Sequence, residues 1–547
     1  MASRGYSASG GPRKAGYAPA VAEVSGSGSK VYVVGAGPGD PGLVTLRGLE
    51  ILGRADVVLY DALVDPAVLG LAPEAAVKID VGKHPGSGGA GTAGGGQDAI
   101  NARMIDEARG GRTVVRLKAG DPTLFARYFE EIAALERAGV AFEVVPGISS
   151  VAAAAAYAGI PLTQRDCSSS VLLLTGHAAA DGSPPVEELR RAALLGGTLA
   201  ILMGMRHLDE VARALVEGGL EGDTPVAVVQ WASRPEQATL VSTLAAVGRD
   251  AASAGLSSPA VVFVGPVVGL RESLRWFDRL PLFGRRVLVL RAAEQSGRLA
   301  ELLRDHGALP IEVPAIRVIP PEDEEPVRRA VRNLGTYGVV VFTSANAVRW
   351  LMKAVQEEGG DSRRFGQTEI CAIGPATVEA LASYGLHADV VPAEHDGEAL
   401  ARAILEARPP GVLRVLLPRA RDAREELPRI LREAGASVDV VAVYRTVAPD
   451  EEGNEALRAA AARADVVTLS SGSTVTNLVA ALGSPDQARA ILEARTVASI
   501  GKVTTEAALR AGLRVDVTAA VPTIASLVTA LSSHFTKNRP TGPGRTR

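Results

Sequence analysis

The feature that most constrains this chain is a repeated alternation of short apolar runs with longer stretches of helical period. The stretches between the runs are rich in Ala, Leu, Glu and Arg. Short apolar runs separated by helices predict parallel sheets that are covered by helices on both faces. With 547 residues, the chain is long enough for three or four such α/β units. The runs are Val31–Val34, Val57–Leu59, Val114–Leu117, Val171–Leu174, Val261–Val264, Val287–Leu290, Val339–Phe342 and Val466–Leu469.

Composition excludes several classes of protein. A net charge of -3 and an aromatic content of 4% argue against a nucleic-acid binder. Two cysteines, Cys167 and Cys371, and seven histidines without ligand spacing give neither a disulfide scaffold nor a metal site. The longest nearly apolar run, Val151–Leu162, is shorter than the ~18 residues of a membrane span, and no leader is visible. We expect a metal-free cytoplasmic protein that binds neither membrane nor nucleic acid.

Shifts in composition divide the chain. Both ends are rich in residues that do not build a core, and a charged stretch with Trp276 and Pro281 precedes a fresh strand. Pro85–Gly96 and Ala178–Pro185 are expected to be flexible loops. We predict a disordered tail (1–29), a first domain (30–270), a linker (271–282), a second domain (283–535) and a disordered tail (536–547).

The second domain contains an internal repeat. VFTSANAV, which starts at Val341, resembles TLSSGSTV, which starts at Thr468. GPATVEAL, from Gly374, resembles GKVTTEAAL, from Gly501, and VLRA near Arg291 resembles LPRA near Arg419. The similar offsets predict two similar α/β lobes.

The first domain opens with a glycine-rich loop, VYVVGAGPGDPG, from Val31. A dinucleotide fingerprint needs a third glycine at a position where this chain has Asp40. A carboxylate there would repel a phosphate at the following helix N-terminus. Pro38 and Pro41 stiffen the loop. The loop therefore favours a ligand without phosphate groups.

Further motifs follow in order: DALV from Asp61, VGKH from Val81, VVRLKAGDP from Val114, VVPGISSVAAAAAYAGIPLT from Val144 and LMGM from Leu202. As a set, they resemble the uroporphyrinogen-III C-methyltransferase branch of the tetrapyrrole methylase family, over about residues 30–270. The resemblance implies two αβα subdomains, S-adenosylmethionine in the cleft between them, and a homodimer formed through this half.

The resemblance also assigns roles. Asp61 would be the proton acceptor and Lys83 the proton donor, because a proton must leave the ring system after a pyrrole carbon attacks the sulfonium methyl. Without the resemblance, simpler roles are also open. Asp61 could cap a turn, Lys83 could be a solvated surface residue, and Met203 could pack in the core. The implied S-adenosylmethionine site is Pro38, Ala119, Gly120, Asp121, Leu124, Ser149, Ser150, Met203 and Ala232.

The chain departs from the family pattern at His84, at Ala119 and over Ala126–Phe129, where the family is richer in glycine. Side chains at such positions keep the backbone farther from a ligand. These departures motivate an alternative in which the first half is catalytically silent.

In the second domain, Ser and Thr residues follow strand ends and open helices. Hydroxyls and free N–H groups at helix N-termini bind carboxylates, and arginines can form charge-assisted pairs, although helix capping alone would also explain single members. We expect these groups to bind a large polycarboxylate. The candidate binding residues are Arg291, Thr343, Ser344, Asn346, Gly374, Thr377, Arg419, Ser470, Ser471, Ser473, Gly501 and Thr504, with Thr505 next to the last.

Over residues 283–535 these motifs, with VAVYRT from Val441, resemble uroporphyrinogen-III synthase. The resemblance implies a cofactor-free, two-lobed α/β enzyme that closes hydroxymethylbilane to uroporphyrinogen III with inversion of ring D. The chain would cross between lobes near residues 320 and 445. Tyr444 matches the implicated tyrosine, a general acid for hydroxyl departure or, alternatively, a residue that packs the hinge.

The two resemblances fit together, because the product of one reaction is the substrate of the other. We therefore predict a bifunctional enzyme that makes uroporphyrinogen III and methylates it twice to precorrin-2, on the way to sirohaem or cobalamin. The alternatives are a synthase with a silent first half, a methylase with another substrate, and a non-catalytic two-lobed ligand sensor.

Overall fold

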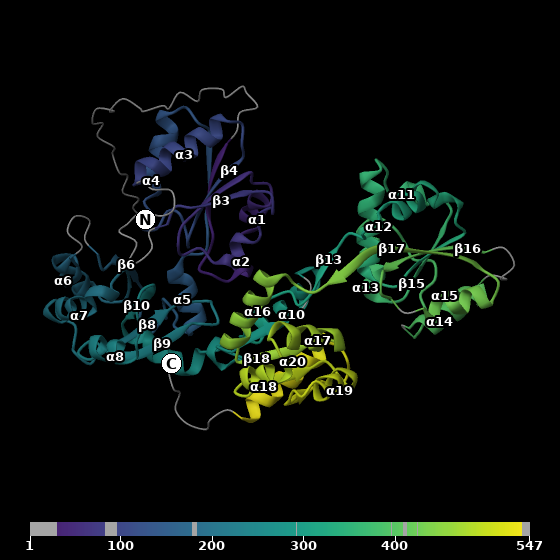
Figure 1. The fold of residues 1–547 in the computed structure, drawn as a ribbon. Coiled ribbons are helices and arrows are strands. Elements are labelled where there is room, and N and C mark those ends of the chain that lie inside the picture. The colour runs from purple at the N-terminus through teal and green to yellow at the C-terminus, as the bar shows by residue number, and fades with distance from the viewer. Residues whose placement is uncertain are drawn as a thin grey trace, which may run out of the picture. The chain divides into compact units, whose positions relative to one another are not determined.

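The computed structural model describes residues 30–82, 96–177, 183–290, 293–394, 396–407, 413–423 and 425–538. These residues form two compact units that divide between Arg275 and Trp276 (Figure 1). Both units are α/β, as predicted. The N-terminal tail and most of both glycine-rich loops, 83–95 and 178–182, lie outside the described residues.

The first subdomain of unit 1 is a parallel sheet in the order β3-β2-β4-β1-β5 with helices on its faces. The buried strands are apolar on both faces because helices cover both. Its elements are β1 (Val31–Gly35), α1 (Leu46–Leu52), β2 (Val57–Tyr60), α2 (Pro66–Leu69), β3 (Val77–Asp80), α3 (Gln97–Arg109), β4 (Val114–Lys118), α4 (Tyr128–Arg137), β5 (Phe142–Val145) and α5 (Ser150–Ala158).

The second subdomain departs from the expectation of parallel sheets. Its order is β6-β7-β10-β8-β9, and only β6 and β7 pair in parallel. The short connection between β8 and β9 makes them a hairpin, and a hairpin is antiparallel. Its elements are β6 (Val171–Thr175), α6 (Val186–Leu195), β7 (Thr198–Leu202), α7 (Leu208–Glu217), β8 (Pro225–Gln230), β9 (Ala238–Thr243), α8 (Val247–Ser253), β10 (Ala260–Val264) and α9 (Arg271–Leu274).

The alanine-rich helix α5 joins the two subdomains. It follows β5 of the first sheet and buries Val151, Ala154 and Ala155 against the second sheet, where Phe263 of β10 is fully buried. Small side chains allow the helix to approach the sheet closely.

Unit 2 has two lobes. The first has a parallel sheet, β12-β11-β18-β19-β20, and the second has β13-β17-β16-β14-β15, in which β13 runs antiparallel to β17. Its elements are β11 (Arg286–Val289), α10 (Ala293–Asp305), β12 (Leu309–Glu312), β13 (Arg317–Ile319), α11 (Glu325–Arg332), β14 (Val339–Phe342), α12 (Ala345–Glu357), β15 (Glu369–Ala372), α13 (Pro375–Ala382), α14 (Gly397–Ala407), β16 (Arg414–Ala420), α15 (Glu426–Glu433), β17 (Ser437–Val447), α16 (Glu451–Arg463), β18 (Val466–Leu469), α17 (Gly472–Ala481), α18 (Pro485–Leu492), β19 (Thr496–Ser499), α19 (Lys502–Arg510), β20 (Val517–Thr518) and α20 (Ile524–Lys537).

The repeated motifs occupy equivalent positions in the two lobes. Ser344 follows β14 and caps α12, while Ser471 follows β18 and caps α17. Gly374 and Gly501 stand before α13 and α19, which follow the neighbouring strands β15 and β19. The sequence repeat therefore corresponds to a structural repeat.

The C-terminal helix is longer than composition suggested. Helix α20 continues to Lys537, two residues into the segment assigned to the tail, and residues 539–547 lie outside the described part. No helix in the described ranges has both the length and the apolar character needed to span a bilayer.

Three loops of the first sheet touch backbone to backbone. A Cβ on Gly147 would lie 2.3 Å from the Gly120 carbonyl oxygen, and one on Gly35 would lie 2.6 Å from the Gly147 Cα. Gly120 itself has φ +69°, a conformation that side chains disfavour. The loops after β1, β4 and β5 can meet only because these positions lack side chains.

Gly147→Ala should therefore lower the free energy of unfolding by about 1–3 kcal/mol, as overpacking does. Gly269→Ala is the matched control, since its Cβ would meet no atom within 4 Å. The control should change the unfolding free energy by less than about 0.5 kcal/mol. Denaturant unfolding of both variants tests this, and equal stabilities would contradict the close approach.

Candidate active sites

The carboxyl edge of the first sheet gathers the predicted methylase residues. Asp61 follows β2, and its backbone N–H donates to the Leu117 carbonyl of β4 at 3.2 Å. The Asp61 side chain is 30% exposed and forms an ion pair with Arg116, which is buried within β4. Asp61 thus presents a fixed carboxylate at the edge of the sheet. Lys83 lies outside the described residues.

The loop after β4 is braced by its own polar groups. Gly120 and Gly37 exchange backbone hydrogen bonds at 2.8 and 3.2 Å, which ties this loop to the loop that carries Pro38. The Asp121 carboxylate accepts hydrogen bonds from Thr123 and from the Gly147 N–H, the latter at 2.9 Å. Although burial opposes the shift, these hydrogen bonds hold the pKa of Asp121 below its usual range. Asp121 therefore fixes the loop geometry.

Backbone strain concentrates beside predicted S-adenosylmethionine residues. Among the described residues, five that are not glycine have positive φ: Phe125, Arg127, Met203, Trp231 and Ser233. They include Met203 itself and flank Leu124 and Ala232. Such conformations cost about 1–3 kcal/mol each and gather at functional sites. Ala232 is buried, whereas Met203 is 46% exposed on the loop after β7.

A second set of contacts joins the loop after β1 to the second subdomain. The Asp40 N–H donates to Ser233 Oγ at 3.2 Å, and the Tyr157 hydroxyl donates to the Asp40 carboxylate at 2.8 Å. Burial and this carboxylate raise the pKa of Tyr157. Asp40 therefore holds the glycine-rich loop in place, a role that its position in the sequence did not suggest.

Helix α5 begins at two more predicted residues. Ser149 is its N-cap and accepts a hydrogen bond from the Val151 N–H at 3.2 Å, and Ser150 is its first residue. Ala119 packs against the core of the first subdomain. Together with Pro38, these residues lie on loops at one edge of the sheet.

In unit 2, the structure brings Tyr444 and Ser344 together. Their hydroxyl oxygens lie 3.2 Å apart, and Ser344 also accepts from the Ala347 N–H at 3.1 Å as the cap of α12. The register between β16 and β17 shifts so that Ala420 pairs with Tyr444 and Val443 is the extra residue. Such a bulge redirects the side chains that follow it. It points Tyr444 toward the start of α12.

The remaining hydroxyl residues lie at helix starts in each lobe. Thr343 precedes the Ser344 cap, and Asn346, which is buried, accepts from Arg349 at 3.0 Å. Thr377 and Thr504 are buried in the first turns of α13 and α19. In the first lobe, Ser471 Oγ lies 3.0 Å from Ser473 Oγ, and Ser470 Oγ lies 3.3 Å from Thr474 Oγ1. Of these side chains, those of Ser344 and Ser471 act as helix caps.

The two predicted arginines differ. Arg419, near the end of β16, is buried and forms an ion pair with Glu425. Arg291 lies outside the described residues. Thr505 belongs to a different cluster, in which its hydroxyl lies 2.5 Å from Ser499 Oγ and 2.9 Å from Thr518 Oγ1.

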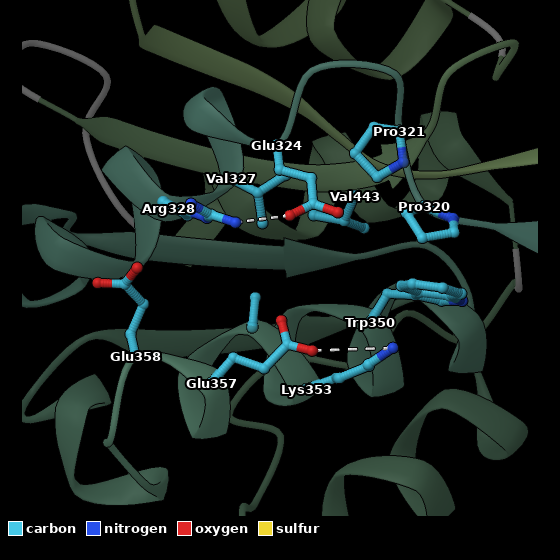
Figure 2. A pocket seen from close by; sticks show the side chains of 11 residues that line it. Pro320, Pro321, Glu324, Val327, Arg328, Trp350, Lys353, Glu357, Glu358 and Val443 are labelled. Carbon is cyan, nitrogen blue, oxygen red and sulfur yellow. Dashed lines mark hydrogen bonds and ion pairs between the residues drawn. The ribbon is translucent and has the colours of Figure 1, made fainter.

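A groove of about 420 Å³ lies in the second lobe, between α11, α12 and the strands that connect the lobes (Figure 2). Trp350 forms one wall, with Lys353 4.8 Å from its ring centre, and Pro320 and Pro321 form another. Val443, the extra residue of the bulge, also lines it. None of the predicted site residues lines this groove.

Comparison with known proteins identifies the two units. Residues 30–248 match the model of tetrapyrrole (corrin/porphyrin) methylases, and residues 297–529 match that of uroporphyrinogen-III synthase HemD. A porphyrin biosynthesis protein HemD of Ruminiclostridium josui is 38% identical over 92% of this chain and 97% of its own length. The chain belongs to the family of tetrapyrrole methylase–uroporphyrinogen-III synthase fusions. It is a bifunctional enzyme of tetrapyrrole biosynthesis.

Other relatives match a smaller share of the chain. A uroporphyrinogen-III C-methyltransferase of Bacillus subtilis is 37% identical over 61% of this chain and 68% of its own length. A siroheme synthase of Chromobacterium violaceum is 46% identical over 46% of this chain, which corresponds to 52% of that protein.

Some residues of the candidate sites were not predicted from the sequence motifs. Arg116 and Lys118 are charged residues of the buried strand β4, and both are almost fully buried with Glu131. The sequence did contain a signal for these two residues, namely charges at alternate positions of an otherwise apolar run. Such charges need partners when they are buried. Tyr157 gave no such signal, since its contact with Asp40 depends on how α5 packs.

Tyr444→Phe should slow ring closure by about 10²-fold, the lower end of what a positioned general acid contributes. The matched control is Tyr337→Phe in the same lobe, where burial and the Asp439 carboxylate raise the pKa of Tyr337 to about 12. The control also loses one buried hydroxyl but should keep the wild-type rate. Cyclisation kinetics and thermal unfolding of both variants separate chemistry from packing, and an unchanged rate in Tyr444→Phe would make Tyr444 structural.

Proposed function

We propose that the second unit closes hydroxymethylbilane to uroporphyrinogen III with inversion of ring D, and that the first unit methylates this product twice to precorrin-2. The methyl donor is S-adenosylmethionine, which supplies an electrophilic methyl group on sulfur. The observation that carries the proposal is the fusion itself, since a relative of 38% identity shares both units along 97% of its length. The proposal assigns one of two consecutive reactions to each unit of the chain.

The methylase part of the proposal rests on the carboxyl edge of the first sheet. Glycine-dependent contacts let three loops meet there, and backbone groups at such loops can approach a ligand closely. Arg116 holds the Asp61 carboxylate at this edge, where it is partly open to solvent. In the proposed reaction, Asp61 accepts the proton that the ring system loses after a ring carbon is methylated, and the loops fix the approach of the two reactants.

The synthase part rests on the paired hydroxyl groups of Tyr444 and Ser344. In the proposal, Tyr444 donates a proton to the departing hydroxyl of hydroxymethylbilane, and Ser344 orients the phenol. The helix N-termini after β14, β15, β18 and β19 bind substrate carboxylates. We propose no cofactor for this unit.

A second candidate is a synthase whose methylase unit is silent. Left-handed backbone at Phe125 and Arg127 and the 74% exposed Phe129 favour it, because this segment adjoins Leu124 of the proposed S-adenosylmethionine site. Bulk in this segment would weaken binding of the methyl donor.

We also propose that the enzyme is a homodimer through its methylase unit. Leu46 and Leu49 lie three residues apart on α1 and are 87% and 42% exposed. Apolar side chains so exposed on one helix commonly mark an interface. Light scattering of the purified protein measures its mass directly.

Product analysis separates the two candidates. Purified protein is incubated with hydroxymethylbilane, with and without S-adenosylmethionine, and the products are identified by mass and isomer type. The bifunctional proposal expects a dimethylated type III product only when the methyl donor is present. Unmethylated type III product in both reactions would establish the second candidate.

Asp61→Ala should lower the rate of methylation by about 10²–10⁴-fold, the range that a positioned general base contributes. Ring closure in the same chain is the internal control and should be unchanged, because the substitution lies in the other unit. Both rates can be measured in one preparation. Wild-type methylation in this variant would remove Asp61 from the mechanism.

A further inference from the structure

A buried charge network lies directly behind Asp61. Arg116 and Lys118 are two residues apart on β4, so both side chains point to the sheet face covered by α3 and α4. Glu131 of α4 meets them there. The side chains of Arg116, Lys118 and Glu131 are only 3%, 3% and 1% exposed.

Glu131 contacts both cations. Its Oε1 accepts from Arg116 Nε at 2.9 Å and from Lys118 Nζ at 3.0 Å, and its Oε2 accepts from Lys118 Nζ at 3.0 Å. Gln97 of α3 reaches the same Oε1 at 3.4 Å. The carboxylate of this α4 residue is therefore bound from the strand β4 and from the other covering helix, α3.

The guanidinium of Arg116 is fixed on every nitrogen. Nε donates to Glu131, Nη1 donates to the Leu59 and Leu117 carbonyls at 3.4 and 3.3 Å, and Nη2 donates to Asp61 Oδ1. Of the four charged groups, only Asp61 reaches solvent appreciably. The network thus transmits the position of Glu131, through one rigid planar group, to the carboxylate at the edge of the sheet.

Stability alone gives little reason for this arrangement. Burying ions is costly, and apolar residues of similar volume often stabilise a core as well or better. The two cations and the two carboxylates balance in charge. Burial and the charge of Arg116 lower the pKa of Lys118, whereas Glu131 acts to raise it. Removal of Glu131 would leave an unpaired ammonium inside the unit.

We propose that Glu131 is a positioning residue for methyl transfer: it holds the Arg116 guanidinium where that group orients Asp61 toward the substrate. This inference rests on the proposed methylase function, in which Asp61 accepts a proton. According to this inference, the position of the Glu131 carboxylate matters for methyl transfer, and not its charge alone. A role in charge balance alone requires only an anion near Lys118.

Two substitutions separate position from charge. Glu131→Asp keeps the negative charge but withdraws the carboxylate from Arg116, whereas Glu131→Gln keeps the length but removes the charge. We expect kcat for methylation to fall about tenfold or more in Glu131→Asp, with the KM for the tetrapyrrole unchanged, because misplaced groups affect the chemical step. Glu131→Gln should lose less, because its amide oxygen can still accept from Arg116 Nε. The affinity for S-adenosylmethionine, measured by calorimetry, and the rate of ring closure should stay at wild-type values.

Another carboxylate on the same helix provides the matched control. Glu136 of α4 is exposed, so Glu136→Gln should leave methylation unchanged. A wild-type kcat in Glu131→Asp would overturn the positioning role and leave charge balance as the function of Glu131. If the wild-type protein itself transfers no methyl group, the proposed function fails together with this inference, and the Glu136→Gln control would reveal this by failing equally.

Folding is controlled by a double substitution. Lys118→Met with Glu131→Leu removes both buried partner charges and should restore the melting temperature, since the unpaired ammonium is gone. Arg116 would still lack its Nε acceptor. We expect kcat to remain low in this folded variant, and recovery of wild-type kcat along with stability would overturn the proposal.

Discussion

Parallel pairing of strands is the constraint on which the arrangement of both units depends. In a parallel sheet, every strand ends at the same edge, so loops far apart in the sequence meet there. In unit 1 this edge collects residues from the ends of β1, β2, β4 and β5. In each lobe of unit 2, the helices whose first turns hold predicted site residues follow neighbouring strands, β14 with β15 and β18 with β19. The reactive groups proposed for both reactions are consequences of this topology.

Much of this topology could be predicted from the sequence, because buried parallel strands are continuous apolar runs. Each of the eight predicted runs overlaps a strand. The strands outside these runs include short edge strands such as β3, in which Val77 and Lys78 are exposed, and also inner strands such as β8 and β16. Strand direction could not be predicted either. The residues of β8 and β10 are as apolar as those of β6, yet they pair antiparallel, and only their connections distinguish them.

The candidate sites were predictable to a lesser extent. The motifs placed Asp61 just past a strand end and Tyr444 where the chain returns between the lobes, but the partners of both residues depend on packing between elements. Arg116 is next to Asp61 because β2 and β4 are neighbours, with Leu59 opposite Arg116 in the register. Glu131 joins them from a helix that lies across the sheet. A sequence shows that such charges need partners but does not show which ones, since several carboxylates lie at comparable distances along the chain.

The structural repeat in unit 2 clarifies why its two lobes contribute differently. The hydroxyl-capped helices occur in both lobes, as expected for groups that bind the similar carboxylates of a repetitive substrate. Tyr444 has no such counterpart. It lies on β17, an eleven-residue strand that pairs with both β13 and β16, whereas the corresponding strand of the first lobe, β12, has four residues. The bulge at Val443 that directs Tyr444 toward Ser344 requires this longer strand. The proposed reaction treats one end of a linear tetrapyrrole differently from the other and so needs an asymmetric group. Within the described residues, Tyr444 lies where the repeat is broken.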